Sequence, residues 1–515
     1  MANGVSARVL GLSVFVLLLV VHLASSIGFG TPLAFWRPAD DAFYYYDTVR
    51  SVATGLGVST DGLHPTSGFH PLWFVVLLPL GALFHEQMNA LLIAAQVLGM
   101  ALLSVAVGFT FHAARRLGSG VVAAAIGGAS LLFAPWRGVA SAGVEGALAL
   151  ALLTSFIVAT TRVLEQPDDS RLQIAGTLAG LCVLAPLDTV ILLGLVISVT
   201  LGSLAKRGKD GRVTAAALRL VVTPSALVLT YLAVNLVRTG EWMPITASLK
   251  STFPKADLEL SFITGNIEYT LAIIVTWLGF GLATNEHART ILLGLSLGST
   301  AFMLYLATFG QGVFWWHFVS LLPGGALGVA VTTDAVVRLA ERRQLGRLTK
   351  RMLTAAAALV LIVPIGTSLA ERSPDGALLA ASGWRVEAER AGRWAADNLP
   401  SNALLAMKDS GAFGFYTSQP TMNLDGVISD RRFNEALCSG TAATEMARAG
   451  VSYVAHHRVP GDYDRFEIRL PCWSEGTAPT LLEFSTADEV YRGPAYHAGG
   501  PDRHFVIWAW EPSNA

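Results

Sequence analysis

Long apolar segments, separated by short loops in which Lys and Arg collect, constrain the fold of this chain most strongly. Only 14% of its 515 residues are charged and 53% are hydrophobic, whereas soluble domains carry about 25% charged residues. An apolar helix of about 20 residues spans the hydrocarbon core of a bilayer. The sequence therefore predicts a polytopic α-helical membrane protein. A formal net charge of −1 gives no sign of the basic surface that nucleic-acid binding requires.

We predict about eleven spans. The first, Val9 to Ile27, is too long for a signal peptide and lacks a small-residue cleavage site, so we expect a retained anchor. The others are expected at about 90–112, 121–135, 144–161, 172–186, 187–205, 214–236, 264–283, 290–308, 315–335 and 352–369.

The basic clusters predict the orientation of the chain. They begin at Arg115, Arg162, Lys206 and Arg338, and short cytoplasmic loops hold the positive excess. All four lie on one side if the short apolar stretch Pro71 to Phe84 is a juxtamembrane helix instead of a span. We therefore expect a plasma (inner) membrane protein with a cytoplasmic N-terminus.

The composition divides the chain into two domains. Residues 1–370 form the transmembrane domain, with a first external loop at 28–89, and polar residues return from Glu371 onward. A helical pattern at 386–398 and strand patterns at 403–407, 450–455 and 505–510 predict a soluble extracytoplasmic α+β domain at 371–515. Cys438 and Cys472 lie in it, either as a disulfide, which an oxidising compartment would allow, or as two separate thiols.

The segment after the first span holds an unusual concentration of titratable groups. Asp40 and Asp41 begin a helix with an aromatic run, 43–46, and Asp47 lies two turns beyond Asp40. His64 and His70 follow in a Gly-rich loop. The acidic pair could simply favour the dipole at a helix N-terminus. The histidines, the aromatic run and the length of the loop together favour an active site.

Other external polar groups are weaker candidates. Arg238 and Lys250 lie in a loop that could fold over a substrate phosphate or remain solvated. His317 begins a span after two tryptophans, where an aromatic belt is the ordinary interpretation. Glu145 and Asp188 lie at helix ends facing the same side, and a structural pair of Glu145 with Arg137 is equally compatible. In the tail, Asp409 and Asp425 are turn formers or acceptor ligands.

Several familiar motifs do not occur in the sequence. There is no Gly-rich phosphate loop of the P-loop or dinucleotide type, and no HExxH or CxxC motif. These absences argue against ATP-driven transport and against a site for a nucleotide-sugar.

Two segments resemble the GT-C superfamily of membrane glycosyltransferases. They are Asp40 to Trp73, with its DDAFYYYDTVRSVATGLG and GFHPLW stretches, and Arg393 to Asp430 in the tail. The layout of the spans is similar to that of the protein mannosyltransferases, the aminoarabinose transferases and the mycobacterial arabinofuranosyltransferases. The resemblance implies a polyprenyl-phosphate-linked sugar donor, and a glycan, lipid or protein of the cell envelope as acceptor.

The resemblance also implies roles for particular residues. Asp40 would be the general base of an inverting displacement, and Asp41 would hold the acceptor, a Mg²⁺ or Mn²⁺ ion, or the neighbouring base. The Glu-Lys-Pro motif of the aminoarabinose enzymes is missing, and His70 stands at that place. The groups expected to bind donor phosphate or substrate are His70, Lys250, Tyr44, His64, Arg238, His317 and Glu145.

Two other functions remain open from the sequence. A flippase or transporter of lipid-linked saccharide would place its polar groups near the midplane and often shows inverted repeats. In this chain the ionisable residues gather at one mouth and no repeat stands out. A non-enzymatic wall-binding assembly protein would use the tail domain and leave the acidic loop structural.

Overall fold

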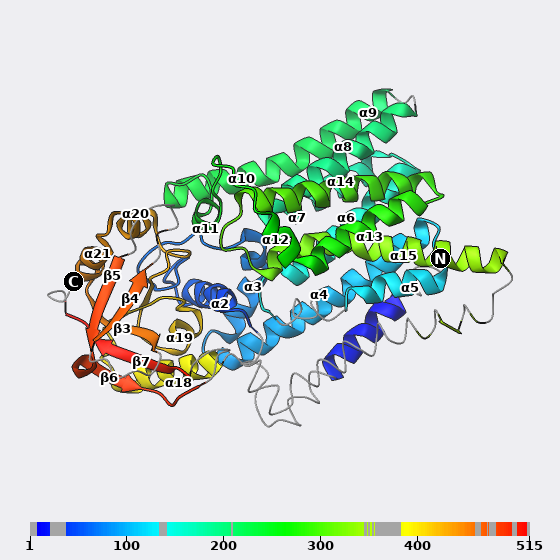
Figure 1. The fold of residues 1–515 in the computed structure, drawn as a ribbon. Coiled ribbons are helices and arrows are strands. Elements are labelled where there is room, and N and C mark those ends of the chain that lie inside the picture. The colour runs from blue at the N-terminus through cyan, green and yellow to red at the C-terminus, as the bar shows by residue number, and fades with distance from the viewer. Residues whose placement is uncertain are drawn as a thin grey trace.

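The computed structural model describes residues 8–20, 38–132, 142–207, 210–343, 383–458, 465–470, 480–496 and 502–511, with a few isolated positions such as Cys472. The predicted span at 352–369 lies almost entirely outside these residues, as do Arg137 and most of the loop before Asp40. Figure 1 shows a long helical bundle with a smaller sheet-containing domain at one end.

The described part of the bundle is built from helices that coincide with the predicted spans. They are α4 (Met88–Arg116), α5 (Val121–Ser130), α6 (Gly146–Glu165), α7 (Asp169–Leu184), α8 (Val190–Lys206), α10 (Thr223–Thr239), α13 (Ile267–Leu282), α14 (Glu286–Phe309) and α15 (Leu322–Arg342). Shorter pieces are α9 (Asp210–Ala217), α11 (Ile245–Leu249) and α12 (Leu260–Gly265), with single turns at Leu187–Thr189, Leu218–Val222 and Trp315–Leu321. Within the described ranges, six helices are long and apolar enough to cross a membrane. The chain is thus a polytopic membrane protein.

The basic clusters meet at one end of the bundle. Arg116 at the end of α4 forms an ion pair with Glu165 at the end of α6. Arg207 after α8 pairs with Glu286 at the start of α14, at 3.2 Å, and donates to the carbonyl of Leu164 at 2.7 Å. The sheet domain occupies the opposite end (Figure 1). This arrangement agrees with the prediction that the basic loops share one side.

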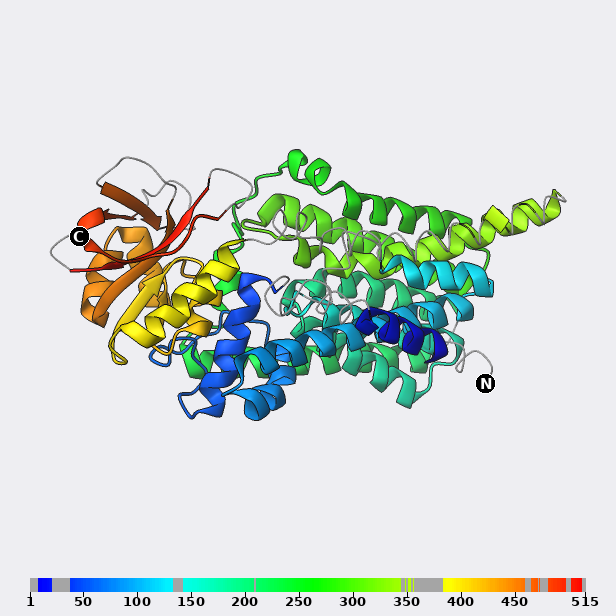
Figure 2. The same ribbon diagram turned by 90° about the horizontal axis from the view of Figure 1, so that it is seen from below.

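Two short helices, an amphipathic one and an apolar one, lie at the end that faces the sheet domain. They are α2 (Asp40–Ala53) and α3 (Pro71–Phe84), the latter with the bounds predicted for a juxtamembrane helix. Figure 2 shows α2 running across the ends of the bundle helices instead of along them. The two helices pack closely, because a Cβ atom at Gly81 of α3 would lie 2.7 Å from the Cβ of Val49 on α2.

The C-terminal domain is a three-layer α+β structure. Its central sheet has the order β2-β1-β3-β7-β6, with β1 parallel to β2 and β3, and β7 antiparallel to β3 and β6. The strands are β1 (Leu404–Met407), β2 (Thr421–Asn423), β3 (Val451–Arg458), β6 (Glu489–Arg492) and β7 (His504–Ala509), and β4 (Arg465–Leu470) pairs separately with β5 (Thr480–Ser485). The predicted strands at 403–407, 450–455 and 505–510 correspond to β1, β3 and β7.

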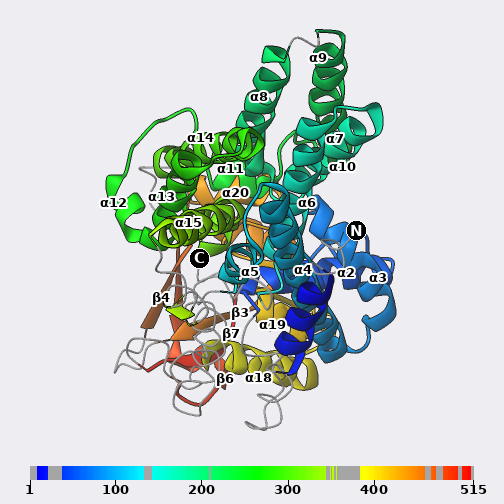
Figure 3. The ribbon, with the colours of Figure 1, turned by 90° about the vertical axis from the view of Figure 1, so that its right-hand side faces the viewer.

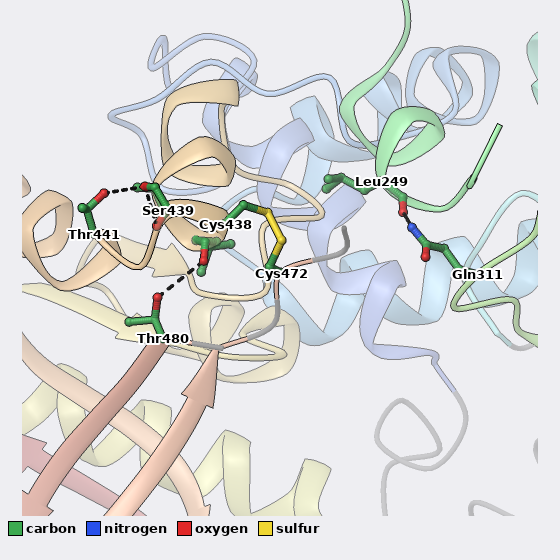
Figure 4. Close-up of a disulfide and its surroundings, with 9 residues drawn as sticks. Leu249, Gln311, Cys438, Ser439, Thr441, Cys472 and Thr480 are labelled. Carbon is green, nitrogen blue, oxygen red and sulfur yellow. Dashed lines mark hydrogen bonds between the residues drawn. A yellow bond between two sulfur atoms is a disulfide. The ribbon is translucent and has the colours of Figure 1, made fainter. Parts of the chain in front are cut away.

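Alternate residues of the strands face different layers, as the period of two requires. Leu405, Met407 and Phe505 pack against α18 (Gly383–Asn398), α19 (Gly411–Tyr416) and α2. Leu404, Val454 and Trp508 pack against α20 (Arg431–Ser439), α21 (Ala442–Ala449) and the β4–β5 pair. A disulfide joins Cys438 of α20 to Cys472, with a Cα–Cα distance of 4.8 Å (Figure 4).

Candidate active site

A cavity of about 570 Å³ lies where the bundle, the acidic loop and the C-terminal domain meet. Its walls come from α2, the 68–70 loop, the start of α6, the turn before α8, the 243–253 loop and the segment after α14. Six of the predicted site residues line it: Asp41, Tyr44, His70, Glu145, Lys250 and His317. The fold therefore brings together groups that are up to 276 positions apart in the sequence, from Asp41 to His317.

Asp41 and Lys250 form an ion pair in the lining of the cavity. The Nζ of Lys250 lies 3.6 Å from Oδ2 of Asp41 and 5.3 Å from the centre of the Phe314 ring. The Lys250 side chain is only 15% exposed. A mobile point charge next to a carboxylate is suited to a phosphate ligand, because Lys binds phosphate in this way in other folds.

Main-chain contacts hold the Lys250 loop against the bundle. Gln311 donates from its backbone to the carbonyl of Lys250 at 3.1 Å and from its side chain to the carbonyl of Leu249 (Figure 4). The amide of Ile245 donates to Ser67 Oγ at 3.2 Å, which ties the same loop to the acidic loop. Of the two arrangements that the sequence left open, the structure has the loop lining the cavity.

A second cluster of polar residues in the cavity lining is centred on Glu145. Tyr45 donates to Glu145 Oε2 at 2.9 Å and accepts from the backbone amide of His70 at 3.0 Å. His70 Nε2 lies 3.6 Å from Glu145 Oε1. Burial, reinforced by the Glu145 charge, raises the pKa of Tyr45 well above its usual value, so this phenol remains a proton donor. The three residues therefore hold one another in place in the lining of the cavity.

Asp40 lies at the contact between α2 and the C-terminal domain. Its Oδ1 accepts from the amide of Ala412 at 2.9 Å, and its Oδ2 accepts from the amide of Gly411 at 3.1 Å. Both amides begin α19 of the C-terminal domain, and Asp40 does not line the cavity. Burial and the nearby Asp409 carboxylate raise the pKa of Asp40 well above its ordinary range.

Helix periodicity explains why Asp40 and Asp41, which are adjacent in the sequence, lie on different faces of α2. Asp40, Phe43 and Asp47 share the face of α2 that meets α19, where Phe43 lies 5.5 Å from the Phe415 ring. Asp41, Tyr44 and Tyr45 share the face that lines the cavity. The predicted common orientation of Asp40 and Asp47 is thus present, but it points toward the C-terminal domain.

The C-terminal domain reaches the cavity through the carboxyl ends of β1 and β2. Asn423 donates to Tyr44 Oη at 3.0 Å and to Asp425 Oδ2 at 3.1 Å. Asp425 also accepts from the amide of Asp409 at 3.2 Å, and Asp409 has a left-handed φ of 53°. Burial raises the pKa of Asp425 to about 6. A hydrogen-bonded chain therefore runs from this sheet edge to a cavity-lining tyrosine.

Two predicted ligands lie elsewhere. His64 Nδ1 is 2.7 Å from Asp61 Oδ2, outside the cavity lining, and this hydrogen bond raises the pKa of His64. Arg238 is exposed near the end of α10 and also does not line the cavity. The sequence predictions for these two residues as substrate ligands find no support in their positions, because a local acidic partner and solvent already satisfy them.

Two cavity residues carried little signal in the sequence, and a third, Asp188, was only one of the weaker candidates there. Asp188 lines the cavity from the turn before α8, Tyr45 was one member of an aromatic run, and Val427 comes from the distant sheet domain. Tyr45 could have been found from its i+4 spacing to Asp41. Val427 could not, because its contact depends on how the two domains pack.

The side chains around the cavity are poorly suited to binding a divalent metal ion. Among the described residues, no three carboxylate, imidazole or thiolate groups come close enough together to hold a metal ion. Asp41, the predicted ligand, faces the ammonium of Lys250 at 3.6 Å, and that charge repels a cation. We therefore derive no chemical step through Mg²⁺ or Mn²⁺.

Comparison with known proteins places this fold in a class. Residues 378–489 match a family model described as "Domain of unknown function (DUF8728)", and no curated protein sequence matches. Solved structures match over most of the chain, and they are GT-C proteins. The chain has the GT-C fold, a polytopic helical domain followed by a C-terminal domain.

Two of the matching structures illustrate the likeness. ArnT from Cupriavidus metallidurans, bound to undecaprenyl phosphate, is 15% identical, with 96% of this chain and 97% of that chain covered and a TM-score of 0.57. The oligosaccharyltransferase AglB from Archaeoglobus fulgidus, in complex with an inhibitory peptide and a dolichol-phosphate, is 14% identical. The match covers 86% of this chain and 69% of the AglB chain, with a TM-score of 0.53.

Proposed function

We propose that this protein is a glycosyltransferase that moves a sugar from a polyprenyl-phosphate donor to a hydroxyl group of a cell-envelope acceptor. One observation carries the proposal: a carboxylate and an ammonium form an ion pair in the lining of a cavity at the membrane-surface end of a GT-C bundle. A base and a phosphate-binding cation are the two groups that this reaction requires. The lipid phosphates bound to ArnT and AglB support the donor class.

We assign the role of general base to Asp41 in place of Asp40. A base must reach the proton that it removes, and Asp41 lines the cavity while both oxygens of Asp40 accept backbone hydrogen bonds from α19. Asp40 then acts as a positioning residue, since it fixes the start of α2 against the C-terminal domain.

The proposed reaction is a single displacement. The Asp41 carboxylate takes the proton of the acceptor hydroxyl, and the acceptor oxygen bonds to the anomeric carbon of the donor sugar. The bond between that carbon and the phosphate oxygen breaks, and its electron pair leaves with the polyprenyl phosphate. Attack opposite the leaving group inverts the anomeric centre. Lys250 stabilises the added negative charge on the phosphate, and His70 and His317 line the same space.

The ion pair suggests an order of binding. In the free protein the partner of Lys250 is Asp41, and a donor phosphate with its greater negative charge competes for the ammonium. Once Lys250 turns to the phosphate, the Asp41 carboxylate loses its partner and is free to accept the proton of the acceptor hydroxyl. Donor binding thus prepares the carboxylate for the acceptor.

The C-terminal domain is proposed to lie outside the cytoplasm and to help position the acceptor. It contributes Val427 to the cavity and holds Tyr44 through Asn423. Its disulfide suits an oxidising compartment. The acceptor is a glycan, lipid or protein of the envelope, and the plasma (inner) membrane is the expected location.

Binding of undecaprenyl phosphate to the purified full-length protein tests the donor site. We expect Lys250→Ala to weaken this binding at least about tenfold, as for the loss of a charged hydrogen bond. Lys255→Ala, an exposed lysine five positions along the same loop, is the matched control and should bind like the wild type. Asp41→Asn should bind the lipid phosphate at least as tightly, because Lys250 loses its internal partner.

Transfer is then measured with synthetic undecaprenyl-phosphate monosaccharides and an envelope fraction of the source organism. Asp41→Asn should retain lipid binding and lose transfer. Unchanged lipid binding by Lys250→Ala would remove the donor-site assignment. Movement of the lipid-linked sugar across liposomes without acceptor would favour a transporter instead.

A further inference from the structure

A second cavity, of about 280 Å³, lies at the opposite end of the bundle from the proposed active site. It is lined by Arg116, Ala159, Arg162, Arg171 and Ile174. These residues come from α4, α6 and the start of α7, which pack together at the end where the basic clusters meet. Figure 3 looks toward this end of the bundle.

The lining separates a charged rim from an apolar floor. Arg116, Arg162 and Arg171 lie near the helix ends, and Ala159 and Ile174 lie three residues further into α6 and α7. Three residues are about one helical turn, or roughly 5 Å along the axis. The cavity is therefore basic at the level where the predicted spans α4 and α6 end, and apolar just below it.

The rim carries more positive than negative charge. Arg116 pairs with Glu165, and Arg171 pairs with Asp168 at 3.0 Å. Arg162 is exposed and forms no ion pair with any residue in the described part of the chain. The nearby His112 has a buried Nε2 atom without a hydrogen-bond partner there. Three guanidinium groups thus face two carboxylates, with one positive charge left over.

We propose that this cavity binds the phosphate of an anionic phospholipid in the leaflet opposite the active site. Basic pockets between transmembrane helices bind lipid headgroups, and a guanidinium holds phosphate oxygens through two parallel hydrogen bonds. The volume falls near the lower end of ligand pockets, roughly 300 Å³, which suits a headgroup phosphate with the glycerol beside it. The apolar floor at Ala159 and Ile174 meets the start of the acyl chains.

The apolar floor favours a lipid over a free phosphate ion. A free anion gains nothing from Ala159 and Ile174, whereas a phospholipid buries methylene groups against them. The Ile174 side chain is 52% exposed in the protein alone, so an acyl chain can reach it from the bilayer.

Native mass spectrometry of the purified full-length protein tests the proposal through titration with phosphatidylglycerol. We expect Arg162→Ala to weaken the tightest phosphatidylglycerol binding about tenfold or more, as for a lost charge-assisted hydrogen bond. Arg343→Ala is the matched control, because Arg343 is exposed at the end of α15 and lies outside the cavity lining. Its phosphatidylglycerol affinity should equal that of the wild type.

Two further measurements keep the outcome decisive. Phosphatidylcholine, which carries no net charge, should bind the wild type more weakly than phosphatidylglycerol does, and inorganic phosphate should not displace phosphatidylglycerol at millimolar concentration. If Arg162→Ala fails to fold, Arg162→Lys retains the charge but loses the paired geometry, and should bind phosphatidylglycerol more weakly than the wild type does. Equal phosphatidylglycerol affinity in wild type and the Arg162 variant, or full displacement by inorganic phosphate, would overturn the lipid site.

Discussion

At the residue scale, the central feature is that two adjacent aspartates contact different partners: Asp40 accepts hydrogen bonds from α19, and Asp41 pairs with Lys250. The acidic pair, its helix and the histidine of the GFHPLW stretch could be identified from the sequence, because titratable groups are rare in this chain. Which aspartate faces the cavity could not be predicted, since that depends on α19, more than 370 positions away. His64 is a different case, because its partner Asp61 is only three residues away and this local contact holds it outside the cavity.

Asp47 makes stability depend on pH. It is 9% exposed between α2 and α19, and burial raises its pKa to about 8, against the opposing charge of Arg50. Between about pH 4 and 8 the unfolded chain has lost this proton while the folded chain keeps it, so stability falls as pH rises through that window. Each pKa unit of difference corresponds to about 1.4 kcal/mol.

We therefore expect Asp47→Asn to flatten the decline of the unfolding temperature between pH 5 and 8 and to raise it at pH 8. Thermal unfolding of both proteins at a series of pH values measures this. A steeper decline in the variant would contradict the buried, protonated state of Asp47.

At the scale of elements, the account depends on how α19 docks against α2. The helices of the described part of the bundle follow from apolar length, and the juxtamembrane helix at 71–84 follows from its short length together with the positions of the basic clusters. The docking depends on a glycine, because a Cβ atom at Gly411 would lie 2.4 Å from the carbonyl oxygen of Asp40. Gly414, on the same helix, would place its Cβ 3.4 Å from Thr421, an ordinary contact.

Gly411→Ala should loosen the C-terminal domain from the bundle and lower sugar transfer, whereas Gly414→Ala should behave like the wild type. Limited proteolysis between the two domains and thermal unfolding report the loosening. Wild-type protection and transfer in Gly411→Ala would show that the close approach of α19 to Asp40 is not required.

At the scale of the whole molecule, composition predicted the two-domain layout, and hydropathy with charge predicted which loops share an end. Ion pairs such as Arg207 with Glu286 agree with that map. The α+β class of the tail also followed from its short patterns. The contact of the tail with the cavity through Val427 did not, because local patterns carry no information on domain packing.

The proposed orientation predicts which surfaces an impermeant reagent reaches. In intact spheroplasts, a cysteine introduced at the exposed Arg432 of α20 should react with a charged maleimide, and one at Arg343 should react only after lysis. Cys438 and Cys472 are joined and should stay unreactive. The opposite pattern would place the C-terminal domain in the cytoplasm.

The disulfide should contribute to the stability of the C-terminal domain. Loss of a native disulfide typically costs about 2–5 kcal/mol, so Cys438→Ser should lower the denaturation midpoint of this domain. Reducing agent should produce the same change in the wild type and none in the variant. An unchanged midpoint in both experiments would show that the link adds no stability.

The most direct test of the account compares single-turnover sugar transfer by Asp41→Asn and Asp40→Asn, each saturated with an undecaprenyl-phosphate monosaccharide. Removal of a general base lowers the rate by about 10²–10⁴-fold. We predict that loss for Asp41→Asn with donor binding intact, and measurable turnover with lower thermal stability for Asp40→Asn. A folded, donor-binding Asp40→Asn that is inactive, beside an Asp41→Asn that turns over like the wild type, would contradict the assignment.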